Sequence, residues 1–495
     1  MAYFMGIDLG TSSVKALIVD ENGKIKGVGQ AGYEVKTPCP GYAEQDPRIW
    51  WECTKAAVRE CVQKSGLLPK QVSGIGMSGQ MHGLVALDCE GKVIGNSLIH
   101  LDQRSFREKE EILEEAGSLI TEELMNRPGT GMLICSLLWI KRNCPSEYEK
   151  IHTVFSPKDY IRYQLTGEKA TDYCDASATL AFDIKHKSWC KTLIRRLGLK
   201  EEIWPSVRYS HEIAGKISEI ASKETGLCRG TKVVVGTGDC ASALIGNGVT
   251  EEGIISCNIG TSSQIAAVTK ASVLDEEMRC QLWCHGVPDT YVFQGGALNG
   301  GNTLNWFRNK VLKTDCSFEM LDKEAGRICP GCDGLIFLPY LVGERTPWND
   351  PAARGVFFGL GLTHDRAAMT RAVMEGVIYN LRICKDIFDK KEICQERLIS
   401  SGGGARGKAW RQIQADILDM LVYTTEVEEE ACLGAAILAA VGTGSYDSVP
   451  GACEKMVSIC PGVTEPIKTN VQYYRERQEL FYELYESVKG LYQKL

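Results

Sequence analysis

The apolar positions of the first 80 residues fall in short runs separated by turn residues, a pattern that predicts strands. Residues 2–8, 14–20 and 25–35 are AYFMGID, VKALIVD and IKGVGQAGYEV, and Asn22-Gly23 lies between the second run and the third. Asn-Gly between two apolar runs is typical of a β-hairpin turn. The first sheet is therefore expected to begin with antiparallel neighbours.

Helical and strand patterns then alternate. Residues 47–66, PRIWWECTKAAVRECVQKSG, are typical of a helix, and VSGIGMSG at 72–79 is typical of a strand. The alternation continues to KVVVGTGD at 232–239, which predicts a strand ending at Asp239. Alternating helices and strands indicate an α/β fold, whose ligands gather at the carboxyl ends of strands. Asp239 is thus a candidate catalytic base, with capping of the next helix as the alternative.

The pattern of strands begins again in the second half of the chain. Residues 253–269, GIISCNIGTSSQIAAVT, predict two strands around a Gly-Thr turn, and residues 471–495 carry apolar positions at helical spacing. A chain of 495 residues is too long for one ordinary core. The glycine-bearing segment 243–253 separates the two patterns, so we expect domains at 1–246 and 247–495.

Composition and charge exclude several classes of protein. The chain is 44% hydrophobic with a net charge of −7, which argues against a nucleic-acid partner. No apolar run approaches the roughly 18 residues of a membrane span, and no leader precedes the first strand, so we expect a cytoplasmic protein with no membrane partner. The 21 scattered cysteines indicate reduced thiols, and the isolated Cys329-Pro-Gly-Cys332 has metal or redox spacing without a second pair of ligands.

One loop sequence occurs twice, and only its first copy carries an acid. DLGTSS at Asp8 returns as NIGTSS at Asn258. The glycine permits a tight turn, and the neighbouring NH and hydroxyl groups can donate to phosphate oxygens. One carboxylate can hold Mg²⁺ through its waters, whereas a second would repel the phosphates. We therefore predict two turns that hold a polyphosphate from both sides, although Gly-Thr-Ser is also ordinary turn chemistry.

A glycine run at residues 402–407 permits two interpretations. Gly402, Gly404 and Gly407 satisfy GxGxxG between a strand and a helix, and Glu426 follows the next strand, as in dinucleotide-binding sites. No further strand-helix-strand series follows the run, however. A glycine-rich turn that packs against adenosine explains the same residues and is the interpretation we favour.

Long blocks of the sequence resemble the FGGY carbohydrate kinases of the actin-like ATPase superfamily, and within them the xylulose kinases. The similar segments include GIDLGTSSVKALIVD, MSGQMHGLVALD, SPKDYIRYQLTGEKATDYCDASATL, GTGDCASALIGNG, FLPYLVGERTPWNDPAARGVFFGL and SGGGARGKAWRQIQADIL. The resemblance implies an α/β protein of two RNase H-like domains that bind ATP and a sugar in the cleft between them. The activity it implies is ATP-dependent phosphorylation of a terminal sugar hydroxyl, with D-xylulose as the expected substrate and another ketose, gluconate or a polyol as alternatives.

The resemblance also assigns residues. It implies that Asp8 serves Mg²⁺ and that ATP is bound by Thr11, Ser12, Gly260, Thr261, Gly402, Gly403 and Gly404. It places Met81, His82, Asp102 and Asp239 around the sugar, with Asp239 as catalytic base, and we expect Arg104 to orient Asp102 rather than form an ordinary surface ion pair with it. The chain departs from the usual pattern at Cys240, where asparagine is common, and at His100-Leu101, where a tryptophan often precedes Asp102.

Two alternatives from other classes remain. A chaperone-like or filament-forming ATPase shares paired phosphate loops, and a dehydrogenase fits the GxGxxG pattern. The sequence leaves the oligomeric state open and is compatible with a homodimer.

Overall fold

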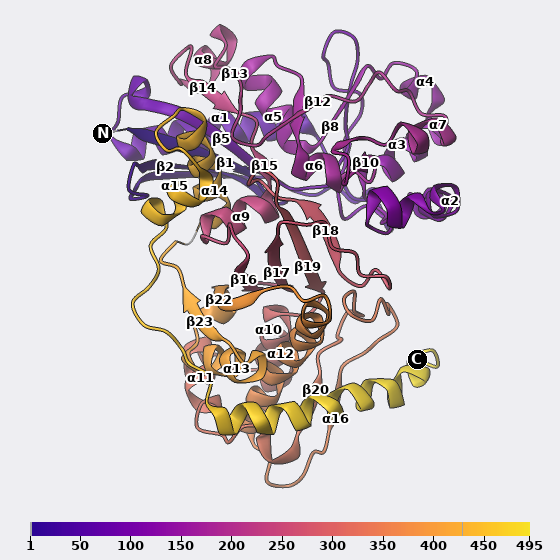
Figure 1. The fold of residues 1–495 in the computed structure, drawn as a ribbon, viewed down its shortest axis with the longest axis vertical. Coiled ribbons are helices and arrows are strands. Elements are labelled where there is room, and N and C mark those ends of the chain that lie inside the picture. The colour runs from indigo at the N-terminus through magenta and orange to yellow at the C-terminus, as the bar shows by residue number, and fades with distance from the viewer. Residues whose placement is uncertain (1, 428) are drawn as a thin grey trace.

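The computed structural model describes residues 2–427 and 429–495, which form two lobes, each built on a central sheet (Figure 1). The N-terminal sheet has the order β13-β14-β5-β1-β2-β3, with β15 paired to β5. The C-terminal sheet has the order β18-β19-β17-β16-β22-β23. The strands of the first sheet are β1 (Tyr3–Leu9), β2 (Ser13–Asp20), β3 (Ile25–Gly32), β5 (Val72–Gly79), β13 (Ile213–Lys216), β14 (Lys232–Val234) and β15 (Thr237–Gly238). Those of the second are β16 (Gly253–Ile259), β17 (Ser263–Thr269), β18 (Gln281–Cys284), β19 (Tyr291–Ala297), β22 (Gln395–Gly402) and β23 (Leu421–Thr424).

The two sheets repeat one arrangement around the duplicated loop. β1 pairs antiparallel with β2 and parallel with β5, and β16 pairs in the same way with β17 and β22. Asp8 therefore lies opposite Ser78, and Asn258 lies opposite Ser401. The strand-turn-strand structure predicted around each copy of the loop is confirmed.

Local signals account for the first elements. β2 and β3 form the predicted hairpin, with Gly23 at a φ of 78°. Helix α1 (Pro47–Ser65) begins after Asp46, whose side chain accepts a hydrogen bond from the Arg48 backbone, and ends at Gly66 in the left-handed conformation. The hairpin and this helix were both predictable because their termini are encoded by neighbouring residues.

The strand predicted at residues 232–239 is wrong in its second half. β14 and β15 are separated at Gly236, which has a φ of 80° and lies against the backbone of Met77. Asp239 is the first residue of helix α9 (Asp239–Gly246) rather than the last residue of a strand. The break occurs because only glycine tolerates both this φ and this close approach.

Part of the C-terminal half of the sequence packs on the N-terminal sheet. Helices α14 (Glu430–Gly442) and α15 (Val449–Met456) lie beside β1 and β2 in Figure 1, and their apolar residues share a core with those strands. Glycines allow α14 to lie directly on the sheet, since a Cβ added at Gly6 or Gly76 would be 1.8 Å from a carbonyl oxygen of the helix. Residue 246 thus separates the two sheets along the sequence, whereas residues 430–456 lie in space with the first sheet.

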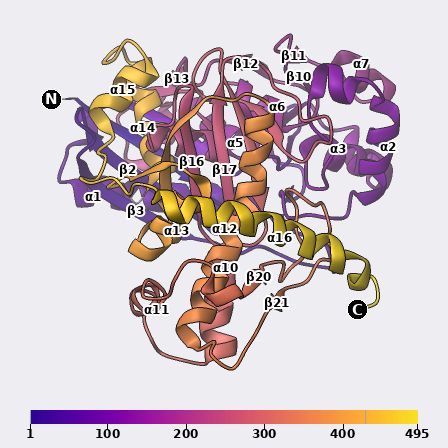
Figure 2. The same cartoon turned by 60° about the horizontal axis from the view of Figure 1, so that its bottom comes forward.

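The remaining helices cover the flanks of the two sheets. Long helix α12 packs beneath the C-terminal sheet, and α16 crosses the outside of that lobe (Figure 2). The helices of this lobe are α10 (Gly301–Trp306), α11 (Phe318–Ala325), α12 (Arg366–Lys390), α13 (Lys408–Leu418) and α16 (Lys468–Tyr492). The N-terminal lobe adds α2 (Phe106–Ala116), α3 (Leu133–Asn143), α4 (Pro145–Tyr148), α5 (Pro157–Thr166), α6 (Tyr173–Ala178), α7 (Lys191–Arg196) and α8 (Glu219–Thr225).

Ten short strands of the described residues complete the fold. Those of the N-terminal lobe are β4 (Glu44–Gln45), β6 (Val85–Leu87), β7 (Ser97–Leu98), β8 (Thr153–Phe155), β9 (Ala170–Asp172), β10 (Phe182–Asp183), β11 (Ser188–Trp189) and β12 (Ser206–Arg208), and those of the other lobe are β20 (Ile336–Leu338) and β21 (Val356–Phe358). All 21 cysteines are free thiols. Among the described residues, no helix combines the length and the apolar character needed to cross a bilayer.

The glycine contact with α14 predicts a large effect of a single methyl group. Gly76→Ala should lower the free energy of unfolding by about 3 kcal/mol, because the added Cβ would overlap the Ala435 carbonyl and force helix and strand apart. Gly490→Ala is the matched control, since nothing lies within 4 Å of a Cβ at that position of α16. Urea unfolding of both variants measures the difference, and equal stability of Gly76→Ala and wild type would contradict the packing argument.

Candidate active site

Asp8 lies at the end of β1, where side chains from three segments meet. The Ser78 hydroxyl donates a hydrogen bond of 2.8 Å to the Asp8 carboxylate. Lys15 is the cross-strand neighbour of Asp8, and its ammonium forms a 2.7 Å ion pair with Glu429 at the start of α14. Burial raises the pKa of Asp8 above its usual value, while Ser78 and Lys15 act in the opposite direction.

The turn that follows Asp8 is held through its carbonyl groups. Gln45 donates a 2.7 Å hydrogen bond from Nε2 to the Thr11 carbonyl, and the Tyr33 hydroxyl donates to the Gly10 carbonyl. The Thr11 and Ser12 hydroxyls make no hydrogen bond with the described residues. The turn is therefore fixed from behind while its hydroxyl groups are free to meet a ligand.

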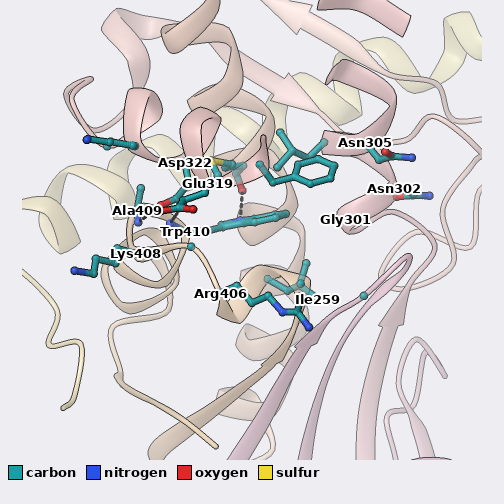
Figure 3. A pocket seen from close by; sticks show the side chains of 18 of the residues that line it. Ile259, Gly301, Asn302, Asn305, Glu319, Asp322, Arg406, Lys408, Ala409 and Trp410 are labelled. Carbon is teal, nitrogen blue, oxygen red and sulfur yellow. Dashed lines mark hydrogen bonds between the residues drawn. The ribbon is translucent and has the colours of Figure 1, made fainter. Parts of the chain in front are cut away.

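The second turn borders a pocket of ≈ 1200 Å³ in the C-terminal lobe. Gly260, Thr261 and Gly403 contribute to its wall, so the structure brings together three residues that the sequence assigned to nucleotide binding. The Trp410 ring lies across the middle of the pocket in Figure 3, with Arg406 and Ile259 on one side of it. Helices α10 and α11 supply further lining residues, among them Asn302, Asn305, Phe318, Glu319 and Lys323. The volume is ample for a nucleotide.

The glycine run beside this pocket allows close packing of the backbone and also contributes to the pocket wall. Gly402 has a φ of 73°, and a Cβ added at Gly404 would lie 2.6 Å from the Ile259 side chain. Gly407 approaches Asp322, which accepts 3.0 Å hydrogen bonds from the first backbone amides of α13. The GxGxxG spacing therefore follows from contacts with β16 and α11, and Gly403 is the glycine of the predicted triplet that lines the pocket.

Asp239 begins α9 and is half-buried. Its carboxylate accepts a 2.7 Å hydrogen bond from the Cys240 backbone amide, so it does contribute to the helix terminus. Burial and the nearby Asp8 carboxylate raise the pKa of Asp239 to about 7. No described cation forms an ion pair with it. A carboxylate with this pKa exchanges protons near neutral pH, as a general base must.

Met81 and His82 follow β5 and face the same region. Met81 packs against Gly238, and His82 adopts a φ of 72°. The His82 Nδ1 donates a 2.8 Å hydrogen bond to the Ala178 carbonyl, and its ring meets Trp283 of β18 edge-on at 5.3 Å. Burial lowers the pKa of His82 to about 4, so the ring is neutral near pH 7 and its Nε2 is an acceptor.

Asp102 forms a buried ion pair with Arg104, so the alternative of an ordinary surface pair is wrong. Asp102 is 1% exposed and accepts a 2.7 Å hydrogen bond from the Ala43 amide and a 2.9 Å hydrogen bond from Arg104 Nε. The Arg104 guanidinium stacks 3.8 Å above the Tyr42 ring and also pairs with Glu44. Arg104 fixes the orientation of Asp102, and contact of Asp102 with a sugar stays a prediction.

A fully buried charged cluster contacts β15, the strand that directly precedes Asp239. The Lys158 ammonium is 2.7 Å from Asp159 and 2.9 Å from both Asp172 and Asp175. Asp172 also accepts a 2.9 Å hydrogen bond from Thr237, which is two residues before Asp239. Burial raises the pKa of Asp175 well above its usual range. Because breaking a buried pair typically costs about 3–5 kcal/mol, the cluster fixes β15 and therefore the start of α9.

Several residues around the site had no signal in the sequence. Ser78 is brought to Asp8, and Ser401 to Asn258, only by the parallel register of their strands. Asn258 donates a 2.8 Å hydrogen bond to Ser401. Trp283 reaches His82 from the other lobe. Strand register would have found the serines once the sheet order was known, whereas the contact between lobes depends on tertiary structure alone.

Comparison with known proteins agrees with this geometry. Residues 3–246 match the N-terminal domain, and residues 255–443 the C-terminal domain, of the FGGY family of carbohydrate kinases. The chain is 34% identical to a xylulose kinase of Bacillus subtilis over 99% of its own length and 98% of that protein. A xylulose kinase structure from Rhodospirillum rubrum superposes with a TM-score of 0.92 at 27% identity, covering 99% of this chain and 100% of that one. A gluconate kinase structure from Lactobacillus acidophilus gives 0.93 at 26% identity, covering 100% and 99%. Because both family domains are present and in order, the chain belongs to the FGGY family of carbohydrate kinases and has their two-domain, actin-like ATPase fold.

Proposed function

We propose that this kinase transfers the γ-phosphate of ATP to the terminal hydroxyl of D-xylulose, producing D-xylulose 5-phosphate. The observation that carries the proposal is the raised pKa of Asp239. At about 7, this pKa suits proton transfer near neutral pH. The choice of sugar is supported by the similarity over nearly the whole chain to a xylulose kinase. The dehydrogenase and non-kinase ATPase alternatives do not agree with the family.

Asp239 acts as the general base in this proposal. Phosphoryl transfer needs alignment of the acceptor hydroxyl with the γ-phosphorus and little covalent work by the protein. The ionised carboxylate accepts the hydroxyl proton as the new O–P bond forms. The buried Lys158 cluster holds the start of α9 and so fixes where this carboxylate stands.

ATP binding is assigned to the two turns and the glycine run. Thr11 and Ser12 bind phosphate oxygens on one side, and Gly260 and Thr261 bind them on the other. Gly402, Gly403 and Gly404 are assigned to adenosine, with Gly403 in the pocket wall and the other two shaping the turn against Ile259. Mg²⁺ is assigned to the Asp8 carboxylate at the end of β1, where Ser78 orients it through a 2.8 Å hydrogen bond. Mg²⁺ usually takes one or two carboxylates and completes its shell with water and phosphate. When bound, it would neutralise phosphate charge near Asp8 and Asp239.

Met81, His82 and Asp102 are assigned to the sugar, with Arg104 orienting Asp102. Gluconate is the alternative acceptor with specific support, because a gluconate kinase structure superposes as well as a xylulose kinase structure does. A cytoplasmic location and a homodimer are further proposals that rest on the sequence.

The acceptor is tested with a panel of ketoses, aldoses, polyols and gluconate. D-xylulose should give the highest kcat/KM, since a site built to hydrogen-bond a particular set of hydroxyls rejects analogues that leave its polar groups unpaired. His82→Ala should reduce kcat/KM for D-xylulose much more than sugar-independent ATP hydrolysis. If another acceptor exceeds D-xylulose by more than about tenfold, roughly 1.4 kcal/mol in transition-state binding, the proposed substrate is wrong.

The general base predicts a defined pH profile. Because Asp239 must be ionised, kcat/KM for the sugar should rise with pH and reach half of its plateau near pH 7. Asp239→Asn should reduce kcat on the plateau above pH 7 by about a hundredfold or more and should remove this pH dependence. Burial of the charge also destabilises the fold as pH rises from about 4 to 7, because the folded pKa lies above the unfolded one. The variant should thus be at least as stable as wild type at pH 8. If the folded variant keeps the wild-type kcat, Asp239 only caps the helix.

The duplicated loop predicts that charge is harmful in its second copy. Asp8→Asn should strongly reduce Mg²⁺-dependent turnover, and Asn258→Asp should raise KM for ATP about tenfold or more, because a carboxylate near the phosphates repels them. Asn22→Asp adds the same charge in an exposed hairpin turn and is the matched control. Steady-state kinetics of the three variants decide the matter, and full activity of Asn258→Asp argues against the charge explanation.

A further inference from the structure

Arg345 lies on the loop after β20, between two neighbours that hydrogen bonds hold in place. Glu344 and Thr346 are each 2% exposed, whereas Arg345 is exposed. The Glu344 carboxylate accepts hydrogen bonds of 2.6 Å from the Leu298 amide and 2.8 Å from the Arg345 amide. The Thr346 hydroxyl donates a 2.7 Å hydrogen bond to the Arg279 carbonyl. The backbone at residue 345 is therefore fixed, whereas its side chain is exposed.

The Arg345 guanidinium rests on β19 and keeps most of its donors free. Its Nε donates a 3.0 Å hydrogen bond to the Gly296 carbonyl. Gly296 permits this position, since a Cβ there would overlap the guanidinium Nη2. Neither Nη makes a hydrogen bond or ion pair with any residue that the structure describes. A preorganised guanidinium with unused N–H groups is suited to binding oxygen atoms of a ligand.

Residues of the other lobe meet β19 beside Arg345. The Cys240 thiol donates a 3.0 Å hydrogen bond to the Gln294 side chain, and Gln294 lies two residues before Gly296, on the same face of β19. The Nδ1 of His100 is buried and has no hydrogen-bond partner among the described residues. Burial and then the charge of Arg345 lower the pKa of His100, and the same charge adds to the effect of burial on His82. His100 and Cys240, two of the departures from the usual family sequence, therefore border the same space as Arg345.

Cys240 lies between the proposed base and Arg345. It follows Asp239 directly in α9, and its thiol donates to Gln294 of β19, the strand whose Gly296 accepts from Arg345. A hydroxyl that loses its proton to Asp239 thus lies on one side of Cys240. The rest of the same acceptor extends toward Arg345 and His100.

We propose that Arg345 and His100 determine acceptor specificity by holding the end of the sugar that is remote from the phosphorylated hydroxyl. The guanidinium N–H groups donate to the carbonyl and hydroxyl oxygens of a polyhydroxy ketone, and the free nitrogen of His100 pairs with a neighbouring hydroxyl. The inference rests on the proposed sugar-kinase function and adds residues from both lobes to its acceptor site.

Kinetic constants of Arg345→Gln, His100→Ala and Gly296→Ala test the inference with the acceptor that wild type uses best. Arg345→Gln should raise KM for that acceptor about tenfold or more while KM for ATP and sugar-independent ATP hydrolysis stay within twofold of wild type. His100→Ala should act in the same direction. Gly296→Ala keeps Arg345 but displaces its guanidinium, so it should also raise KM for the acceptor.

Arg354→Gln is the matched control because Arg354 is exposed on the same loop and donates only to nearby carbonyls. If wild type phosphorylates no acceptor of the panel, the proposed function fails. If wild type is active but Arg345→Gln and Gly296→Ala leave KM for the acceptor unchanged, or raise KM for ATP equally, the specificity role alone is wrong. Should Arg345→Gln fail to fold, Gly296→Ala and His100→Ala still decide between these outcomes.

Discussion

The backbone contact between α14 and the glycine faces of β1 and β5 is the constraint on which the active site depends. The helix comes from the C-terminal half of the sequence, yet a single methyl at Gly6 or Gly76 would overlap its carbonyl groups. Because the helix lies this close to the sheet, its start brings Glu429 to Lys15, beside Asp8. The same helix packs on α9, which begins with Asp239. Glycine at two strand positions thus fixes where Glu429 and the start of α9 lie relative to Asp8.

The duplicated turn uses one scaffold with opposite hydrogen-bond directions. In the first copy Ser78 donates to Asp8, and in the second copy Asn258 donates to Ser401, with the same distance of 2.8 Å and the same strand register. Replacing the carboxylate by an amide reverses the donor without moving the strands. The second turn can therefore keep its geometry while it carries no negative charge, which suits a turn that faces phosphate oxygens.

Local sequence signals predicted much of the fold, and tertiary contacts account for the errors. The hairpin at Asn22-Gly23, helix α1 and both Gly-Thr-Ser turns were predictable because their residues specify their own backbone conformation. The strand ending at Asp239 was predicted wrongly because Gly236 packs against a neighbouring strand that the local pattern does not contain. The contact of Thr237 with Asp172 in the Lys158 cluster and that of His82 with Trp283 do not follow from spacing, since their members lie far apart in sequence.

The acids of the candidate site differ in their partners. This difference distinguishes acids with a structural role from the candidate catalytic acid. Asp102 is paired with Arg104, and Asp172 is paired with Lys158, so burial of both charges is compensated within the protein. Asp239 has no such cation among the described residues, and the charge that acts on it is another acid, Asp8. An uncompensated acid of this kind destabilises the fold, which marks it as a candidate for a ligand or a reaction. Arg345, whose guanidinium forms no ion pair with the described residues, belongs to the other lobe, so the proposed acceptor site has an unpaired acid on one lobe and an unpaired cation on the other.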